Sequence, residues 1–252
     1  MYHFFVEPTQ INTNDNSVII SGNDVNHIRN VLRMKIGEEL NISNGQDGRE
    51  YRCAIDSFEE DRIVCRLRFI KEDNIELPSK VYLFQALPKA DKMELIIQKA
   101  VELGVYRIIP VAAKRCVVKL EGKKAASKIA RWQGIAEAAA KQSKRAIIPE
   151  VTDVLNFSQA VDLASDMDIK LIPYELAEGM TKTREIIEEL MPKQDIALFI
   201  GPEGGFEEGE IQTAVDNGII PITLGRRILR TETAGMTVLS WIMYRLEGSG
   251  EG

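Results

Sequence analysis

Two stretches near the end of the chain decide its fold: residues 195–206 read DIALFIGPEGGF and residues 219–234 read IIPITLGRRILRTETA. Each begins with a short apolar run, typical of a buried strand, that stops at a glycine and continues into a polar loop. A helical pattern starts near Glu207 after the first loop, and an apolar helix over residues 236–246 follows the second. Because open parallel sheets bind ligands at the carboxyl ends of their strands, we predict that these loops form a ligand site.

The sequence upstream also favours a parallel sheet. Compact apolar runs recur at residues 81–86, 105–111, 147–151, 169–174, 196–200 and 219–224. Helical patterns separate most of these runs, and the first, over residues 89–103, ends before Gly104, where the C-terminus of a helix usually places a glycine. Strands and helices in alternation predict an α/β domain in which helices cover the faces of a parallel sheet.

The first 70 residues follow a different pattern, that of a small β-barrel. Short, partly alternating runs are separated by Asn, Asp and Gly and lie at residues 4–6, 17–20, 39–42, 51–58 and 62–70. One helix is expected over residues 24–33, and its buried face is predicted to hold Val25, Ile28 and Val31 or Leu32. We therefore predict a barrel domain over residues 1–72, a polar linker over 73–79 and a sheet domain over 80–252.

The net charge of −6 is unevenly distributed along the chain. Residues 78–150 carry +9 (15 Lys and Arg against 6 Asp and Glu), whereas residues 1–77 carry −5 and residues 151–252 carry −10. The basic segment, residues 114–145, has ten basic and only two acidic side chains, and its single aromatic residue, Trp132, is expected in the core. This local excess favours a surface for a polyanion, although a solvated helix face would show it too.

Some of these basic residues are spaced for phosphate contacts. Lys124, Lys128 and Arg131 lie four and three residues apart, which aligns them on one face of a helix. Each phosphate that such a stripe neutralises releases counterions. Arg29 and Arg33 are likewise predicted to be neighbours on a face of the N-terminal helix.

Missing motifs exclude several classes of protein. The chain has no GxGxxG, GxxxxGK[ST], GxSxG or HExxH pattern, so the usual dinucleotide, P-loop, serine-hydrolase and zinc-protease sites lack their defining residues. The three cysteines are widely spaced, so neither a metal site nor a disulfide framework is expected. Both histidines, His3 and His27, belong to the N-terminal domain, which argues against histidine-based catalysis in the sheet domain. Without a signal peptide or a membrane-spanning run, the protein is expected in the cytoplasm.

The glycine loop, residues 201–206, offers backbone groups to a ligand. Gly201, Gly204 and Gly205 permit positive φ angles and a close approach to bare peptide groups, and Pro202 stiffens the turn. Such a loop suits a flat, uncharged group such as adenine. The glutamates at positions 203, 207, 208 and 210 disfavour phosphates and would tolerate a cationic sulfonium. Equally, the sequence could be a turn before a helix whose acidic first turn complements the helix dipole.

The arginine loop, residues 225–230, supplies positive charge. Its three arginines, at positions 226, 227 and 230, lie within five residues of one another and directly precede the sequence Thr231-Glu232-Thr233. One of the two threonines is expected to be the N-cap of the apolar helix that follows. Capping does not explain three arginines at the end of a strand.

Together these segments resemble a known family. Residues 198–206 (LFIGPEGGF) and 224–234 (LGRRILRTETA) are similar to the signature loops of the RsmE family. Shorter matches at residues 27–33, 98–104, 115–119 and 137–145 extend the resemblance over essentially the whole chain. Members of this family are SPOUT-class methyltransferases, which use S-adenosylmethionine to methylate N3 of a uridine in 16S ribosomal RNA.

The resemblance implies an architecture and partners. The expected fold is α/β, with a PUA-like N-terminal β-barrel that binds RNA and a C-terminal SPOUT parallel-sheet domain tied in a trefoil knot. A homodimer is implied, in which each cofactor pocket lies beside the partner subunit. The implied substrate is 16S ribosomal RNA or the assembled small ribosomal subunit, and no membrane partner is expected.

By motif position, the resemblance also implies site residues. The cofactor, S-adenosyl-L-methionine, would contact Pro173, Tyr174, Glu175, Ile200, Gly201, Pro202, Glu203, Gly204, Leu224, Gly225, Ile228, Leu229 and Arg230. The candidate RNA-binding residues are Arg29, Arg33, Arg115, Lys119, Lys124, Lys128, Arg131, Lys144 and Arg145. Two positions depart from the family pattern, since His3 stands where Arg is usual and Cys116 where Ser is usual, and the family's RNA contacts are not carried over to them.

The arginine loop motivates a hypothesis for the chemistry. The uridine N3 loses its proton as it receives the methyl group, so negative charge builds on O2, N3 and O4. Arg230, or Arg227 as the second choice, would stabilise that charge as an oxyanion-hole donor does. Glu232 or Glu203 would accept the proton, unless water takes it.

Two other functions fit part of the sequence. A noncatalytic RNA-binding or ribosome-assembly factor would share the barrel and the basic segment, but it would not need arginines and carboxylates beside a cleft lined by backbone. A methyltransferase that acts on another RNA, such as transfer RNA, would share the site as well.

Overall fold

The computed structural model describes residues 1–71, 75–177 and 179–247. The chain divides into two compact units: Met1–Glu76 with Ala140–Ile148 form the N-terminal unit, and Leu77–Ala139 with Pro149–Gly252 form the C-terminal unit. The N-terminal unit is therefore discontinuous, because a segment from the middle of the chain returns to it. Of the linker predicted over residues 73–79, residues 73 and 74 lie outside the described residues.

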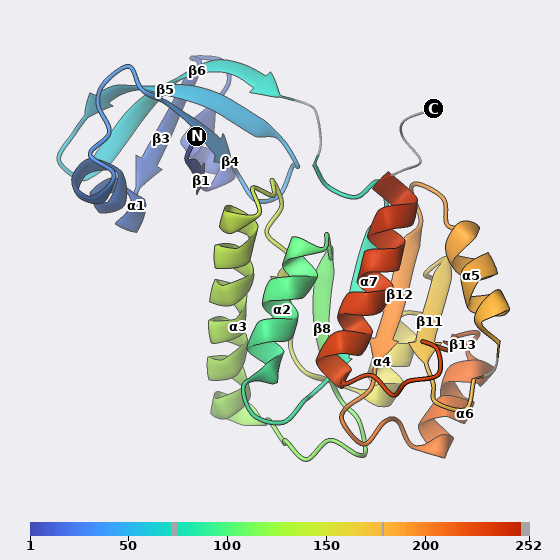
Figure 1. Ribbon diagram of the computed structural model, residues 1–252. Helices are drawn as coiled ribbons and strands as arrows, with labels where there is room; N and C mark the ends of the chain where they lie inside the picture. The colour runs from blue at the N-terminus through green and yellow to red at the C-terminus, as the bar shows by residue number, and fades with distance from the viewer. Residues whose placement is uncertain (72–74, 178, 248–252) are drawn as a thin grey trace. The chain divides into compact units, whose positions relative to one another are not determined.

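A curled, mixed sheet forms the N-terminal unit (Figure 1). Its six strands, in spatial order, are β1 (His3–Phe5), β4 (Glu39–Ser43), β5 (Glu50–Phe58), β6 (Arg62–Lys71), β3 (Ser17–Ser21) and β2 (Ile11–Asn12). Only β1 and β4 pair in parallel. Alternate residues face the core, so Val18 and Ile20 of β3 are buried together with Leu40 and Ile42 of β4. The predicted β-rich domain is confirmed, except that β2 and the 3₁₀ turn before it, η1 (Pro8–Gln10), were missed.

The helix predicted over residues 24–33 is short and changes type. Helix α1 (Asn23–Asn26) runs directly into a π-helical turn, η2 (His27–Val31). Val25 and Ile28 are buried as predicted, but Val31 is 62% exposed. Of the two alternatives for the next position on this face, Leu32 is the one that packs against the core, because the wider turn shifts the 3.6-residue period by one residue and leaves Val31 outside.

The C-terminal unit contains a sheet in which every pairing is parallel, as predicted. Its strands, in spatial order, are β10 (Leu155–Asn156), β8 (Arg107–Ala112), β7 (Lys80–Ala86), β12 (Asp195–Ile200), β11 (Ile169–Pro173) and β13 (Ile220–Ile222), with β9 (Glu150–Val151) also paired to β8. The central strand β12 lies between β7 and β11, which explains its uninterrupted apolar sequence. The trefoil knot stays a prediction.

Helices cover the sheet of this unit. They are α2 (Lys92–Glu102), α3 (Gly122–Gln142), α4 (Phe157–Leu163), α5 (Met180–Glu188), α6 (Glu208–Asp216) and α7 (Thr231–Glu247). α2 and α7 lie side by side over the sheet (Figure 1). A separate apolar cluster joins the stacked rings of Phe84 and Phe199, whose centroids are 4.3 Å apart, to Phe157 of α4 and Ile211 of α6.

Two details of the helices agree with the sequence. Gly104 follows α2 at a φ of +86°, and its N–H donates to Val101 O at 3.1 Å, so the predicted glycine C-terminus is confirmed. Trp132 on α3 is only 4% exposed, so it packs in the core as expected.

Candidate functional site

The predicted cofactor residues lie at one edge of the parallel sheet. Strands β12, β11 and β13 are adjacent, and residues 200–204, 173–175 and 224–230 continue from their carboxyl ends. The register places Ile200 opposite Gln85 of β7 and Pro173 opposite Ile222 of β13. The sheet therefore brings together three segments that are far apart in the sequence, at the edge where parallel sheets bind ligands.

The glycine loop is a tight turn in which bare backbone is required. Gly205 has a φ of +67°, and its N–H donates to Pro202 O at 2.9 Å. A Cβ on Gly201 would lie 3.3 Å from the ring of Phe206, a buried side chain at the end of the loop. A Cβ on Gly204 would touch the stem of Arg115 at 3.6 Å. The loop is thus held close to its neighbours, and its conformation depends on glycine.

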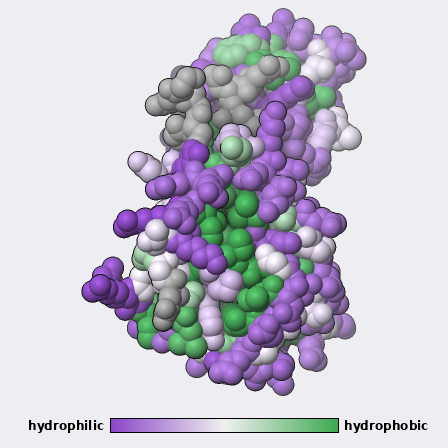
Figure 2. Space-filling model, turned by 90° about the vertical axis from the view of Figure 1, so that its right-hand side faces the viewer, coloured by the Kyte–Doolittle hydropathy of each residue, from purple (hydrophilic) through white to green (hydrophobic). Residues whose placement is uncertain are grey.

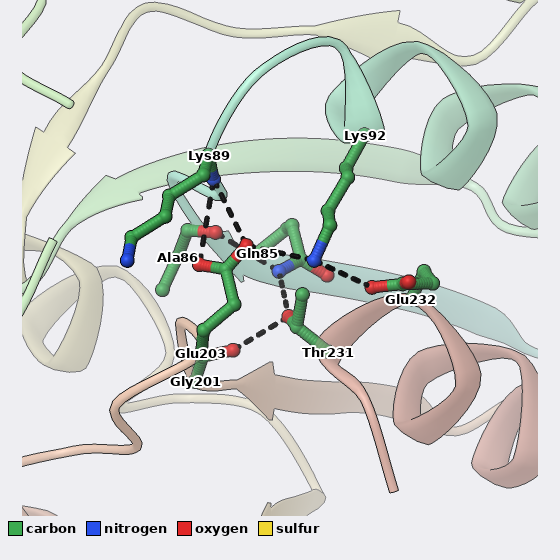
Figure 3. Close-up of polar contacts among 8 residues, drawn as sticks. All are labelled: Gln85, Ala86, Lys89, Lys92, Gly201, Glu203, Thr231 and Glu232. Carbon is green, nitrogen blue, oxygen red and sulfur yellow. Dashed lines mark hydrogen bonds and ion pairs between the residues drawn. The ribbon is translucent and has the colours of Figure 1, made fainter. Parts of the chain in front are cut away.

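The glutamates of this loop are paired with lysines. Glu203 Oε1 accepts from Lys92 Nζ at 2.9 Å and from the backbone N–H of Lys89 at 3.1 Å (Figure 3). Glu207 accepts from Lys114 Nζ at 2.7 Å. Lysines from the segments that follow β7 and β8 therefore offset two of the glutamates that we expect to tolerate a cationic ligand.

The pKa values of these pairs reflect the same contacts. Burial works to raise the pKa of Glu203, but hydrogen bonds from Lys92 and from backbone N–H groups outweigh it, so the pKa lies below its ordinary value. The hydrogen bond and charge of Lys114 lower the pKa of Glu207. Hydrogen bonds to these carboxylates raise the pKa values of Lys92 and Lys114 in turn. Both pairs therefore stay ionised at neutral pH.

A buried neutral network links the glycine loop to the start of α7. Gln85, a fully buried amide in β7, donates through Nε2 to Ala86 O at 2.9 Å and to Thr231 Oγ1 at 3.0 Å. The Thr231 hydroxyl donates to Gly201 O at 2.6 Å (Figure 3). Sequence reasoning missed Gln85, although an amide in an otherwise apolar strand was a signal for it.

Neither threonine is the N-cap of α7, so that prediction is wrong. The first helical hydrogen bond runs from Ala234 N to Arg230 O, which places Arg230 at the N-cap position. The Thr231 hydroxyl is committed to Gly201, and Thr233 lies inside the helix. Arg230 is thereby fixed where the arginine loop meets the helix.

The arginine loop is exposed. Gly225 turns the chain at a φ of +99°, and the side chains of Arg226, Arg227 and Arg230 are solvent-accessible, as is Ile228 at 83%. Among the described residues, no carboxylate lies within ion-pair distance of these three guanidinium groups. They are free to contact an anionic ligand.

The ends of β11 and β13 are tied to each other and to α5. Tyr174 N donates to Ile222 O at 3.0 Å. Thr223, just before the arginine loop, donates its N–H to the buried hydroxyl of Thr183 at 3.2 Å and accepts from it at 3.3 Å. Tyr174 is half-buried and Glu175 exposed, so both can line the site.

Several candidate RNA-binding residues make contacts that the sequence did not predict. Arg115 donates to Gly204 O at 3.0 Å, Arg131 pairs with Glu94 at 2.8 Å, and Lys128 lies 3.8 Å from Asp91. The last two contacts turn the predicted basic stripe of α3 toward α2. Lys119, Lys124 and Lys144 remain exposed.

Two predictions about basic residues need correction, and a third basic residue, Arg29, makes contacts that the sequence did not predict. Arg145 is only 4% exposed and pairs with the buried Glu76, so it is not available to RNA in this structure. Arg29 donates to the backbone carbonyls of the turn between β5 and β6, at Glu59 and Glu60. Arg33 is exposed but follows the π turn at a φ of +53°, so it is not a helical neighbour of Arg29.

The two departures from the family pattern are both partly buried. Among the described residues, neither ring nitrogen of His3 has a hydrogen-bond partner. Burial, with smaller contributions from the charges of Lys141 and Lys144, lowers the pKa of His3 to about 4, so the ring is neutral at pH 7. Burial raises the pKa of the half-buried Cys116 thiol. A neutral imidazole cannot neutralise a phosphate as an arginine does.

The described residues offer neither a metal-binding cluster nor a membrane-spanning helix. Within the part of the chain that the structure describes, no three His, Cys, Asp or Glu side chains are grouped to hold a metal ion. None of its described helices combines the length and the apolar character needed to span a bilayer.

Two domain families match successive parts of the chain. An RNA methyltransferase PUA domain matches residues 20–68, and an RNA methyltransferase domain matches residues 75–243. Ribosomal RNA small subunit methyltransferase E of Bacillus subtilis is 40% identical over 251 residues, which is 98% of each chain. This chain belongs to the RsmE family. The protein of the same name from Mesomycoplasma hyopneumoniae is 34% identical over 95% of this chain and 98% of its own.

Two solved structures of relatives hold the cofactor. A putative methyltransferase from Legionella pneumophila, in complex with SAM, is 34% identical with a TM-score of 0.81 and covers 97% of this chain and 98% of its own. The RsmE protein of Neisseria gonorrhoeae, bound to S-adenosyl methionine, is 31% identical with a TM-score of 0.82 and covers 97% of each chain. The SAM-dependent fold predicted from the loops is thereby confirmed.

Proposed function

We propose that this RsmE-family protein transfers the methyl group of S-adenosylmethionine to N3 of a uridine in 16S ribosomal RNA. One observation carries the proposal: the three cofactor segments continue from three adjacent parallel strands, and the unpaired arginine loop is one of them. The exposed backbone of the glycine loop and the charged side chains of the arginine loop thus lie at the same edge of the sheet. A protein that only bound RNA would not need this arrangement.

The residues at this edge fit the cofactor. A Cβ on Gly205 or Gly225 would meet no heavy atom within 4 Å, so the peptide groups there are open to a ligand. Tyr174 and Leu229 are half-buried beside the same strand ends and would contact its apolar parts. When bound, the cofactor supplies an electrophilic methyl group. The protein's own part is to hold the uridine, stabilise its anion and accept its proton.

Two arginines would stabilise the uridine anion. Arg230 is held at the N-cap position of α7, while Arg227 lies in the exposed loop before it. A guanidinium beside O2 or O4 would offset the charge that develops when N3–H is lost. Arg230 is the better candidate because its backbone is fixed by the helix.

The two candidate proton acceptors are not equivalent. Glu203 has a lowered pKa and is occupied by Lys92 and the backbone of Lys89, so it is a poor base. Glu232, in the first turn of α7, pairs among the described residues only with Lys92, at 3.5 Å. We therefore assign proton acceptance to Glu232 or to water, and cofactor binding to the glycine loop that Glu203 holds.

We further propose that the protein works as a homodimer in the cytoplasm. Figure 2 shows apolar surface on the C-terminal unit. Apolar side chains exposed on this unit include Ile228 of the arginine loop at 83% and Leu176 after β11 at 71%, both beside the predicted site, and Tyr244 near the far end of α7 at 83%. Exposed apolar side chains near a site are typical of surfaces that another subunit covers. A second copy on this surface would also complete the cofactor pocket.

Incubation with methyl-labelled S-adenosylmethionine tests the function. The substrates are small-subunit RNA and small ribosomal subunits from a strain that lacks the activity, with transfer RNA as the competing substrate. We expect label in 3-methyluridine of 16S RNA. Comparing naked RNA with assembled subunits identifies the substrate form. Cofactor binding without transfer to 16S RNA would favour another RNA, and no cofactor binding by calorimetry would favour a noncatalytic binder.

A further inference from the structure

A lysine outside the predicted site contacts both candidate proton acceptors, Glu203 and Glu232. Lys92 begins α2, and its Nζ lies 2.9 Å from Glu203 Oε1 and 3.5 Å from Glu232 Oε2 (Figure 3). The exposed fractions of the three side chains are 26%, 25% and 16%, respectively, so all three are largely shielded from water. Glu203 and Glu232 belong to different elements, the glycine loop after β12 and the first turn of α7. One ammonium group therefore joins three elements.

These contacts set the position of the arginine loop. Glu232 follows Arg230 by two residues, and Thr231 between them is bound to Gly201 O at 2.6 Å. The start of α7 is thus attached to the glycine loop by one neutral contact and by the bridge through Lys92. Without the ammonium, the carboxylates of Glu203 and Glu232 would repel each other and drive the loop and the helix apart.

We propose that Lys92 is a positioning residue of the methyl-transfer site: by bridging Glu203 and Glu232 it fixes the glycine loop relative to Arg230. This role rests on the function proposed above. In this role Lys92 acts through Glu203 and Glu232 and not on the reacting atoms. Its hydrogen bond to Glu203 raises its pKa, so the bridge stays charged at neutral and mildly alkaline pH.

Three variants test the role: Lys92→Met, Lys92→Arg and the control Lys170→Met. Lys170 lies at the amino end of β11, where its Nζ donates to Ser165 O at 2.9 Å, so the control loses a lysine contact at the opposite edge of the sheet. We expect Lys92→Met to raise the Kd and KM for S-adenosylmethionine by about tenfold or more and to lower kcat. Lys92→Arg, which can still bridge two carboxylates, should recover within about threefold of wild type, and Lys170→Met should match wild type.

The pH profile separates positioning from a merely structural role. The charged and titratable groups around Glu203 are Lys92 of α2, Glu232 of α7, and Arg115 and Cys116 after β8. Without Lys92, burial is opposed only by the backbone hydrogen bonds to Glu203, so the pKa of Glu203 should rise. The acid limb of kcat/KM should therefore move to higher pH in Lys92→Met and return in Lys92→Arg. Should Lys92→Met not fold, Lys92→Gln, which is uncharged but still donates, gives the same pH test.

Each outcome decides between specific alternatives. Unchanged cofactor affinity and an unshifted acid limb in Lys92→Met would overturn the role. So would an equal loss at every pH that Lys92→Arg does not restore. If the wild-type protein itself neither binds S-adenosylmethionine nor transfers methyl, the proposed function fails, and this role fails with it.

Discussion

Arg230 is the residue whose position in the structure bears most directly on the proposed chemistry. It is exposed, lacks an ion-pair partner among the described residues and is held at the N-cap position of α7. If it stabilises the uridine anion in the transition state, Arg230→Ala should lower kcat at saturating cofactor by about a hundredfold or more, beyond any loss of cofactor affinity. Single-turnover methyl transfer with saturating RNA measures this directly.

Arg226 provides the matched control for that experiment. It lies on the same loop and is equally exposed, but it is farther from the helix. Arg226→Ala should therefore change kcat by less than about threefold and mainly weaken RNA binding, because a solvated arginine contributes to phosphate attraction. Weaker RNA binding with an unchanged kcat in Arg230→Ala would assign Arg230 to binding alone.

His3 makes a residue-scale prediction about pH. Its pKa lies near 4 in the folded protein, mainly because the ring is buried, and at the ordinary value of 6.5 when unfolded. Between these values the unfolded chain binds a proton that the folded chain does not, so stability falls as pH drops from 6.5 to 4. The full effect is at most about 3 kcal/mol. Urea denaturation between pH 4 and 7 should show a shallower decline for His3→Leu, and equal slopes would refute the assignment.

At the scale of elements, replacing Gly104 or Gly134 by alanine should change the stability of the protein in opposite directions. Gly104 ends α2 at a φ of +86°, and a Cβ there would lie 2.8 Å from the side chain of Leu77. Gly104→Ala should destabilise the protein by about 1–3 kcal/mol. Gly134 lies within α3 with no atom within 4 Å of a Cβ, so Gly134→Ala should stabilise it by about 0.5–1 kcal/mol. Chemical denaturation measures both, and a loss of stability in both variants would contradict the argument.

The elements themselves were largely predictable, and the exceptions have physical causes. Strands β7 and β12 are largely buried on both faces, so their sequences are mostly apolar and easy to recognise. Strands β2 and β10 are two residues long, too short for any period to show. The exposure of Val31 follows from a π turn, which no apolar period announces.

The candidate site was predictable only in part for a related reason. Its two loops can be recognised from their own local sequences, because glycines and arginines gather at the ends of strands. Gln85, Lys92 and Lys114 act through partners more than 90 residues away in sequence, so only the folded sheet shows their roles. The same holds for Arg145, whose charge suggested RNA but whose partner is Glu76.

At the scale of the whole molecule, the discontinuous N-terminal unit explains why the domain prediction differs from the two compact units. Residues 140–148 belong to this unit although they follow α3, and a prediction that divides the chain at one linker cannot find them. Their return is marked by an isolated parallel bridge between Gly45 and Ile147 and by Ile148 N, which donates to Gly45 O at 3.1 Å. The unit should therefore depend on the contacts that hold this segment.

Glu76 is the principal contact of that kind. Its carboxylate pairs with Arg145 and accepts from the backbone N–H groups of Ala146 and Ile147, each at 3.1 Å, and both charged side chains are at most 7% exposed. Because breaking a buried charge pair is strongly destabilising and the two backbone N–H groups would also lose their acceptor, Glu76→Ala should cost about 3 kcal/mol or more. Glu39→Ala, which breaks a partly exposed pair with Arg52 in the same unit, should cost less than about 1 kcal/mol. Equal losses in urea denaturation would show that the segment is held mainly by its apolar contacts.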